Sequence, residues 1–367
     1  MDVIKLFKKL LESPSVTPED GGIFDFLEGY LDEFTCIRID CEGVKNLFAY
    51  RRFSEGPHLC FAGHVDVVPP GEGWDNNPFE AVERDGYIYA RGAQDMKSGV
   101  AAFVQALKEA NGFEGTLSLL LTSDEEGPAK YGTLEVLAYL QEQGMLPDAA
   151  IVAEPTCEER FGDAMKVGRR GSINGIIEKH GKQGHAAYPE KATNPIHKVA
   201  QVLPHMAGVD LDSGDEFFSP SKFVITDIRA GMEVTNVTPG KLKLMFNVRN
   251  STKTSLQDVE DFVHRYFKEM NYTLKLEQSA KPFMTDVTTP IVKTLDRSIH
   301  SVTGMTPKHS TAGGTSDARY IAEYGIDVVE FGVKNDTIHA PNERTSIAEV
   351  SALHEVFSEV IRSYVSK

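Results

Sequence analysis

The chain has 367 residues, of which 41% are hydrophobic and 25% charged, and its formal net charge at pH 7 is −16. This length allows two domains and a core large enough to fold without disulfides. The negative charge argues against nucleic acid and against an anionic membrane surface as partners, because both repel an acidic protein. An anionic small-molecule substrate would therefore need cationic side chains placed close to it.

The cysteines and the N-terminal segment predict a cytoplasmic protein. Cys36, Cys41, Cys60 and Cys157 form no CxxC pair and no disulfide framework, so reduced thiols are expected. The segment Met1–Leu10 is amphipathic at helical spacing and lacks the apolar stretch and cleavage site of a signal peptide. No run approaches the roughly 20 apolar residues that a membrane-spanning helix needs.

Helix and strand signals alternate along the first part of the chain. The expected elements are, in chain order, helices near 2–12 and 22–34, a strand at 58–62, a helix at 97–110, a strand at 117–121, a helix at 134–140 and a strand at 149–153. This alternation predicts an α/β domain with a mostly parallel sheet flanked by helices.

The pattern changes after about residue 170 and returns near residue 286. Half-exposed strands are expected at 171–179, 222–228 and 241–248, with helices near 194–207 and 255–270. After the return, we expect a helix near 290–303, an apolar run at 327–331 and a closing helix at 347–365. We therefore predict a discontinuous catalytic domain, residues 1–172 and 286–367, with a smaller α+β domain inserted at 173–285.

Carboxylates and histidines follow the ends of the expected strands. They are His64 and Asp66 after 58–62, Asp95 before the helix at 97–110, Glu125 and Glu126 after 117–121, Glu154 after 149–153 and His339 after 327–331. In an open α/β sheet, ligands bind at this edge. Histidine and carboxylate ligands suit zinc, manganese or cobalt. The sequence therefore predicts a site for two ions, which five protein ligands can fill if one carboxylate bridges.

Taken singly, each of these residues could have an ordinary structural role. The acidic pair at 125–126 could be a solvated loop, Asp95 could cap the following helix, and His64 could be a core histidine. Their coincidence at one edge of one sheet favours the metal site. A scaffold or binding protein that had lost catalysis would lack at least one of them.

The remaining carboxylates suit supporting roles. Asp66 could accept the proton on the second ring nitrogen of His64, which would fix its tautomer. Glu125, next to the expected ligand Glu126, could act as general base on a metal-bridging water. The expected chemistry is metal-assisted hydrolysis of a carbonyl compound.

The spacing of these motifs resembles that of the dinuclear zinc deacylases and exopeptidases, which include aminoacylase, carboxypeptidase and dipeptidase relatives. The matching motifs are His64-x-Asp66, Asp95-Met-Lys-Ser-Gly99, Glu125-Glu126-Gly127, Glu154-Pro155 and a late His339. The resemblance implies two Zn²⁺ per subunit, with Co²⁺ or Mn²⁺ as alternatives at one site. Their ligands would be His64, Glu154 and the bridging Asp95 for one ion, and Glu126, His339 and Asp95 for the other.

The same resemblance implies supporting residues. Glu125 would be the general acid/base, Asp66 would orient His64, and the Asp95–Met96 peptide bond would be cis. His185 would stabilise the oxyanion in the partner subunit's site, which implies a homodimer and an inserted domain that closes as a lid.

Further matching segments suggest where an anionic substrate would bind. Arginine is the usual bidentate partner of a carboxylate, and surface salt bridges are the alternative role for these cations. The expected substrate-binding residues are Lys166, Arg169, Ser172, Tyr188, Asn236, Arg249, Gly314, Thr315 and Asn335.

Overall fold

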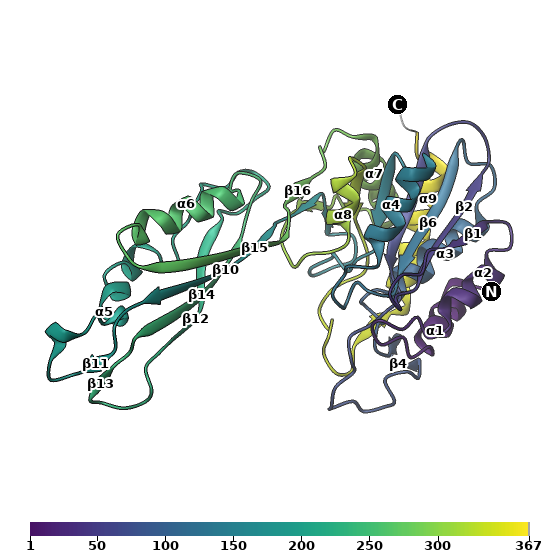
Figure 1. Ribbon diagram of the computed structural model, residues 1–367. Helices are drawn as coiled ribbons and strands as arrows, with labels where there is room; N and C mark the ends of the chain where they lie inside the picture. The colour runs from purple at the N-terminus through teal and green to yellow at the C-terminus, as the bar shows by residue number, and fades with distance from the viewer. Residues whose placement is uncertain (366–367) are drawn as a thin grey trace. The chain divides into compact units, whose positions relative to one another are not determined.

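The computed structural model describes residues 1–365, which form two compact units (Figure 1). The first unit comprises residues 1–168, 284–310 and those from 316 onward. The second comprises residues 169–283 and 311–315. The expected inserted domain, residues 173–285, differs from the second unit at both ends and lacks the short segment 311–315.

A mixed eight-stranded sheet forms the centre of the first unit, in the order β1-β2-β6-β3-β7-β18-β8-β17. The bounds are β1 (Thr35–Arg38), β2 (Asn46–Arg52), β3 (His58–His64), β6 (Thr116–Thr122), β7 (Ala149–Val152), β8 (Ala164–Lys166), β17 (Lys308–Ser310) and β18 (Asp327–Glu330). The strands β6, β3, β7 and β18 run parallel to their neighbours in this group. The runs of β6 and β7 are apolar throughout most of their length because both of their faces are buried.

The predicted mostly parallel sheet is thus confirmed, but the prediction missed its antiparallel edge. β1 and β2 pair antiparallel with each other, and β2 pairs antiparallel with β6. β2 ends in Tyr50, Arg51 and Arg52, so only its first half is uniformly buried. This mixture hides the alternation by which a strand is recognised in a sequence.

Helices of the first unit gather in two groups around the sheet. Their bounds are α1 (Val3–Leu11), α2 (Ile23–Tyr30), α3 (Lys97–Glu109), α4 (Thr133–Gln143), α7 (Pro290–Thr303), α8 (Ala318–Glu323) and α9 (Ile347–Ser363). α3 packs against α1 and α9, whereas α4 packs against α8, β2 and β6. Phe61 of β3 contacts the rings of Phe103 and Phe357, which joins the sheet to α3 and α9.

Two predicted helices are shorter than expected. The helix expected at 22–34 ends at Tyr30, where Asp32 and Glu33 would place negative charge at the negative end of the helix dipole. The helix expected at 194–207 divides into α5 (Pro195–Ala200) and a 3₁₀ turn (Leu203–His205). Pro204 lies in this turn, where its ring and missing N–H disfavour a continuing α-helix.

The second unit is the predicted α+β structure. Its antiparallel sheet has the order β12-β14-β10-β15, with bounds β10 (Ser172–His180), β12 (Lys222–Ala230), β14 (Lys241–Arg249) and β15 (Tyr272–Ala280). α5 and α6 (Leu256–Phe267) supply apolar residues to the core on one face of this sheet (Figure 1). Gly175 leaves room for the Phe246 ring, since a Cβ there would lie 2.0 Å from a ring atom.

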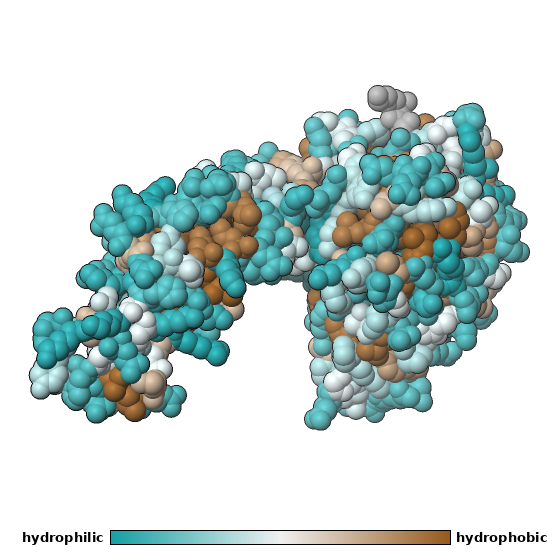
Figure 2. All heavy atoms as spheres, viewed as in Figure 1, coloured by the Kyte–Doolittle hydropathy of each residue, from teal (hydrophilic) through white to brown (hydrophobic). Residues whose placement is uncertain are grey.

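Short strands complete the described chain. They are β4 (Val82–Arg84), β5 (Tyr87–Tyr89), β9 (Gly168–Arg169), β11 (Gly184–His185), β13 (Val237–Thr238), β16 (Phe283–Met284) and β19 (Arg344–Ser346). Hydrophilic side chains cover much of the face of each unit in Figure 2. Within residues 1–365, no helix combines the length and the apolar character needed to cross a bilayer.

His58 makes the stability of the first unit depend on pH. Its Nε2 lies 2.7 Å from Ser118 Oγ, and burial lowers the pKa of His58 from 6.5 to about 4. The unfolded chain therefore binds a proton that the folded chain does not bind until near pH 4. We expect this histidine to lower the free energy of unfolding by up to about 3 kcal/mol as the pH falls through this range.

The variant His58→Gln isolates this contribution. Glutamine can still bond to Ser118 but does not titrate, so wild type should lose stability relative to the variant between pH 6.5 and pH 4. Urea unfolding of both proteins at matched pH measures the difference. Two stability curves that run parallel over this range would contradict the assignment.

Candidate metal centre

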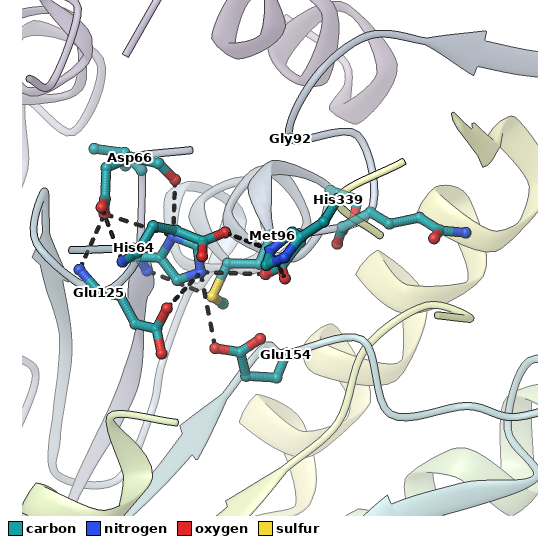
Figure 3. Close-up of polar contacts among 12 residues, drawn as sticks. His64, Asp66, Gly92, Met96, Glu125, Glu154 and His339 are labelled. Atoms are coloured by element: carbon teal, nitrogen blue, oxygen red, sulfur yellow. Dashed lines mark hydrogen bonds and ion pairs between the residues drawn. The ribbon is translucent and has the colours of Figure 1, made fainter. Parts of the chain in front are cut away.

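The expected metal ligands lie at the carboxyl ends of central strands in the first unit. His64 is the last residue of β3, Glu125 and Glu126 follow β6, and Glu154 follows β7. These strands are parallel neighbours, so their carboxyl ends share one edge of the sheet. Figure 3 shows the side chains of His64, Glu125, Glu154 and His339 converging there.

Asp95 contacts both histidines of the cluster. Its Oδ1 lies 3.2 Å from His64 Nε2, and its Oδ2 lies 3.3 Å from His339 Nε2. Further carboxylates lie near both histidines: Glu154 Oε1 and Glu125 Oε2 are 3.8 and 3.9 Å from His64 Nε2, and Glu126 Oε1 is 2.9 Å from His339 Nε2. The two expected ligand groups therefore meet at the two oxygens of one aspartate.

The alternative role of Asp95 as a helix cap is not what the structure shows. α3 begins at Lys97, its N-cap residue is Met96, and no N-cap side chain bonds to its first turn. The Asp95 carboxylate is directed to His64 and His339 instead. The Asp95–Met96 peptide bond is cis, as the resemblance implied.

The donor atoms have the spacing that metal coordination requires. A tetrahedral zinc ion with bonds of about 2.1 Å places its ligand atoms about 3.4 Å apart. The distances from Asp95 to His64 and His339 are 3.2 and 3.3 Å, close to this value. Atoms of His64, Asp95 and Glu126 all lie within 4.8 Å of one another. Among residues 1–365, these three residues, which the two-ion assignment divides between both ions, are close enough together to hold a divalent cation.

The electrostatics of the cluster also fit a cation. His64 is 1% exposed and Glu154 is 7% exposed. Burial raises the pKa of Glu125 and Glu154 well above the usual carboxyl value. Hydrogen bonds with Asp95 and Glu126 raise the pKa of His339 to about 10. A divalent cation would replace the protons of the histidines as the counter-charge of the buried carboxylates.

Asp66 contacts His64 through a different atom from the one expected. The main-chain carbonyl of Asp66 lies 2.9 Å from His64 Nδ1, whereas its carboxylate Oδ1 is 3.6 Å away. The carboxylate instead accepts the main-chain N–H groups of Glu125 and Glu126, at 3.3 and 3.1 Å. Asp66 thus orients the His64 ring with its backbone and holds the Glu125–Glu126 turn with its side chain (Figure 3).

The remaining predicted site residues divide between the two units. Lys166, at the end of β8, and Asn335 belong to the first unit, which also holds the cluster. The second unit holds Arg169, Ser172, His185, Tyr188, Asn236, Arg249, Gly314 and Thr315. The roles of this second group in binding substrate stay predictions.

Within the second unit, Arg169 lies against the glycine-containing segment 311–315. Its Nη1 donates to the carbonyl of Ala312 at 3.2 Å. Gly313 has a φ of +106°, and a Cβ at this residue would lie 2.6 Å from Arg169 Nη1. Arg169 therefore lies in direct contact with Ala312 and Gly313, which precede the predicted residues Gly314 and Thr315 in the chain.

Sequence reasoning missed two buried residues beside the cluster, Arg91 and Glu343. Arg91 is 1% exposed and Glu343 is 0% exposed, and they form an ion pair of 2.7 Å. Arg91 stands four residues before Asp95, a spacing that carries no signal of its own in an irregular segment. Glu343 follows His339 in another irregular segment, where no periodicity distinguishes a buried glutamate from an exposed one.

Known proteins resemble this chain over most of its length. The family model described as peptidase family M20/M25/M40 matches residues 60–363. A succinyl-diaminopimelate desuccinylase from Nitratiruptor sp. is 72% identical over 364 residues, which cover 99% of this chain and 100% of the relative. The chain therefore shares nearly its whole length with that relative.

Solved structures share the fold at much lower identity. The aminopeptidase PepT from Bacillus cereus has a TM-score of 0.81 at 21% identity, and the match covers 98% of this chain and 97% of that chain. The YXEP protein of Bacillus subtilis, described as a dinuclear metal binding peptidase, has a TM-score of 0.73 at 17% identity. That match covers 98% of this chain and 96% of the other.

Removal of divalent cations should lower the melting temperature of the protein. A ligand present at a thousand times its Kd stabilises the folded state by about 4 kcal/mol, and this contribution is lost with the ion. Thermal unfolding with and without a chelator, followed by re-addition of Zn²⁺, Co²⁺ or Mn²⁺, measures the effect. Asp95→Ala is the matched variant, whose melting temperature should respond much less to the chelator. A wild type that responds to none of these treatments would contradict the metal centre.

Proposed function

The chain belongs to peptidase family M20/M25/M40, and we propose that it hydrolyses the amide of N-succinyl-LL-2,6-diaminopimelate to succinate and LL-2,6-diaminopimelate. This activity makes it a metal-dependent amidohydrolase of bacterial lysine and diaminopimelate biosynthesis. The main support is the 72% identity, over almost the entire chain, to a relative that carries the corresponding name. The clustering of His64, Asp95, Glu126, Glu154 and His339 supports the proposal, because side chains of these types hold catalytic metal ions in hydrolases.

We propose that the site holds two metal ions. His64 and Glu154 would hold one, Glu126 and His339 would hold the other, and Asp95 would bridge them. We propose Zn²⁺ at both positions, with Co²⁺ or Mn²⁺ as alternatives at one. Bound ions of this kind polarise the scissile carbonyl and lower the pKa of the attacking water.

Glu125 is the proposed general acid/base. Its Oε2 lies 3.9 Å from His64 Nε2, and its main chain is held by the Asp66 carboxylate. A carboxylate fixed at this point can take a proton from the attacking water and later pass it to the leaving amine. The adjacent Glu126 would hold a metal ion, so the backbone that joins the two residues would set the distance between the ligand and the base.

Buried cations support a substrate with several carboxylates. Lys166 is 4% exposed and Arg169 is 7% exposed, although the chain as a whole carries a net charge of −16. We propose that these residues and Arg249 bind the carboxylates of the substrate. The other proposed substrate contacts are Ser172, Tyr188, Asn236, Gly314, Thr315 and Asn335.

The assembly and the location of the protein are also proposals. His185, which is exposed on the second unit, would complete the oxyanion site of the partner subunit in a homodimer. The inserted unit would close on the substrate as a lid. A cytoplasmic location fits its free cysteines.

A substrate panel tests the proposed acyl group. The alternative is a related activity of the same chemistry, an acetylornithine deacetylase or an aminoacylase-like exopeptidase. Purified protein should show its highest kcat/KM with N-succinyl-LL-2,6-diaminopimelate. Of the substrates compared, only this one carries a carboxylate on its acyl group as well as on its amine portion. Faster hydrolysis of N-acetylornithine would overturn the proposal.

Replacement of Glu125 should separate catalysis from metal binding. In Glu125→Ala, kcat should fall by about 10²–10⁴-fold, the usual contribution of a general acid/base. The metal content, measured by elemental analysis, should stay near that of the wild type because Glu125 is not a proposed ligand. A variant with a near-normal rate would refute this role.

A further inference from the structure

We propose that Arg91 and Glu343 form a clamp that holds two ligand-bearing segments, residues 91–95 and 336–343, in a fixed relation. The clamp would set the affinity of the ion held by Asp95, Glu126 and His339. Arg91 and Glu343 would be positioning residues, since they contact the backbone of the ligand segments. The inference rests on the metal ligands assigned under the proposed function.

Glu343 fixes the segment that ends at Asp95. Its carboxylate accepts the main-chain N–H groups of Gly92, Gln94 and Asp95, at 2.9, 2.7 and 3.1 Å. Charge-assisted bonds of this kind are stronger than neutral ones, and here several act on one short segment. Glu343 directly precedes β19, which pairs with β5, so a sheet fixes the position of the carboxylate.

Arg91 connects the same carboxylate to the segment that carries His339. Its Nη1 donates to Glu343 Oε2 at 2.7 Å and to the Ala340 carbonyl at 3.3 Å. Its Nη2 donates to the His339 carbonyl at 3.3 Å. His339 has a φ of +59°, a left-handed conformation that L-residues rarely adopt without support from their surroundings. The two donors of Arg91 supply that support.

Gln94 joins the two segments a second time. Its Nε2 donates to Asp336 Oδ1 at 2.5 Å, and its Oε1 accepts the main-chain N–H of Thr337 at 2.8 Å. Thr345 Oγ1 also donates to the Ala93 carbonyl at 2.6 Å. The segments before Asp95 and around His339 are therefore bonded along most of their length.

The position of the clamp predicts which ion it affects. It holds Asp95 and His339, whereas His64 and Glu154 are placed by β3 and β7. Loosening the clamp should therefore weaken the ion bound by Asp95, Glu126 and His339 more than the ion bound by His64, Glu154 and Asp95. A buried ion pair that only stabilised folding would change neither affinity selectively.

The variant Glu343→Gln tests the clamp. Glutamine matches glutamate in size, but its single oxygen cannot accept all four bonds that the carboxylate receives. Partners of metal ligands typically contribute about 10–100-fold to metal affinity, so we expect a loss of this size for one of the two zinc equivalents. Titration of metal-free protein with Zn²⁺ against a chromophoric chelator measures both equivalents separately.

The tryptophan of this chain offers an independent readout. The ring of Trp74, the single tryptophan, lies 5.2 Å from the guanidinium carbon of Arg91. Its emission should change in metal-free Glu343→Gln, because Arg91 loses the partner that holds it beside the ring. Arg91 also donates from Nη2 to the Pro70 carbonyl at 3.2 Å, which makes four bonds in all. Arg91→Lys keeps the charge but has too few donors on its one nitrogen for these four bonds, so it should show the same selective loss of zinc affinity.

Asp163→Asn is the matched control. Asp163 also accepts a series of main-chain N–H groups, from Glu158, Glu159 and Arg160 at 2.9, 2.7 and 2.8 Å, in a loop without proposed ligands. This variant should lose thermal stability and keep both zinc affinities. If Glu343→Gln does not fold, Gln94→Ala breaks only the second link and should give a smaller loss of the same kind.

Two results would overturn the clamp. One is a Glu343→Gln protein with both zinc affinities unchanged, as in the control; the other is an equal loss of both. A wild type that binds fewer than two equivalents would instead overturn the ligand assignment under the proposed function.

Discussion

The first unit buries several carboxylates at one edge of its sheet, and the repulsion between their negative charges must be offset by other groups. Two like charges about 4 Å apart repel by about 4 kcal/mol at an effective dielectric constant of about 20. Asp95, Glu126 and Glu154 can stay ionised together only beside cationic partners, which here are histidines and the proposed ions. The surrounding residues continue this pattern, since Asp66 and Glu343 are themselves buried carboxylates that receive main-chain N–H groups. Main-chain N–H groups thus help to stabilise the negative charge of these buried carboxylates.

The sequence predicts two kinds of feature in this structure. They are the elements whose hydrophobic residues recur with a regular period, and the residues that directly follow a buried strand. The runs Leu117–Leu121 and Ala149–Ala153 are largely apolar because both faces of their strands are buried, so β6 and β7 could be located, and with them Glu125, Glu126 and Glu154. β1 and β2 were missed because β1 has no fully buried residue and β2 is buried only in its first part, so neither shows a regular period. Glu343 was missed for two reasons. It lies in an irregular segment, and its carboxylate accepts main-chain N–H groups, which every residue except proline carries, so the residue types of its partners give no signal.

The proposed metal ligands lie in the first unit of the chain, whereas most of the proposed specificity residues, although not Lys166 and Asn335, lie in the second. Arg169, His185 and Arg249 all belong to the second unit. Changes in the inserted unit could alter the acyl group that is recognised without disturbing the ions.

The order of the proposed ligands along the chain has a consequence for biosynthesis. His64, Asp95, Glu126 and Glu154 all precede the inserted unit, whereas His339 follows it and is held by Arg91 from the early part of the chain. A growing chain therefore carries an acidic, incomplete ligand set while the whole second unit is being made. The site becomes complete only when the last segment returns to Arg91. Full occupancy by metal would thus mark a finished molecule, and a truncated chain would expose its unneutralised carboxylates to the quality-control machinery of the cell.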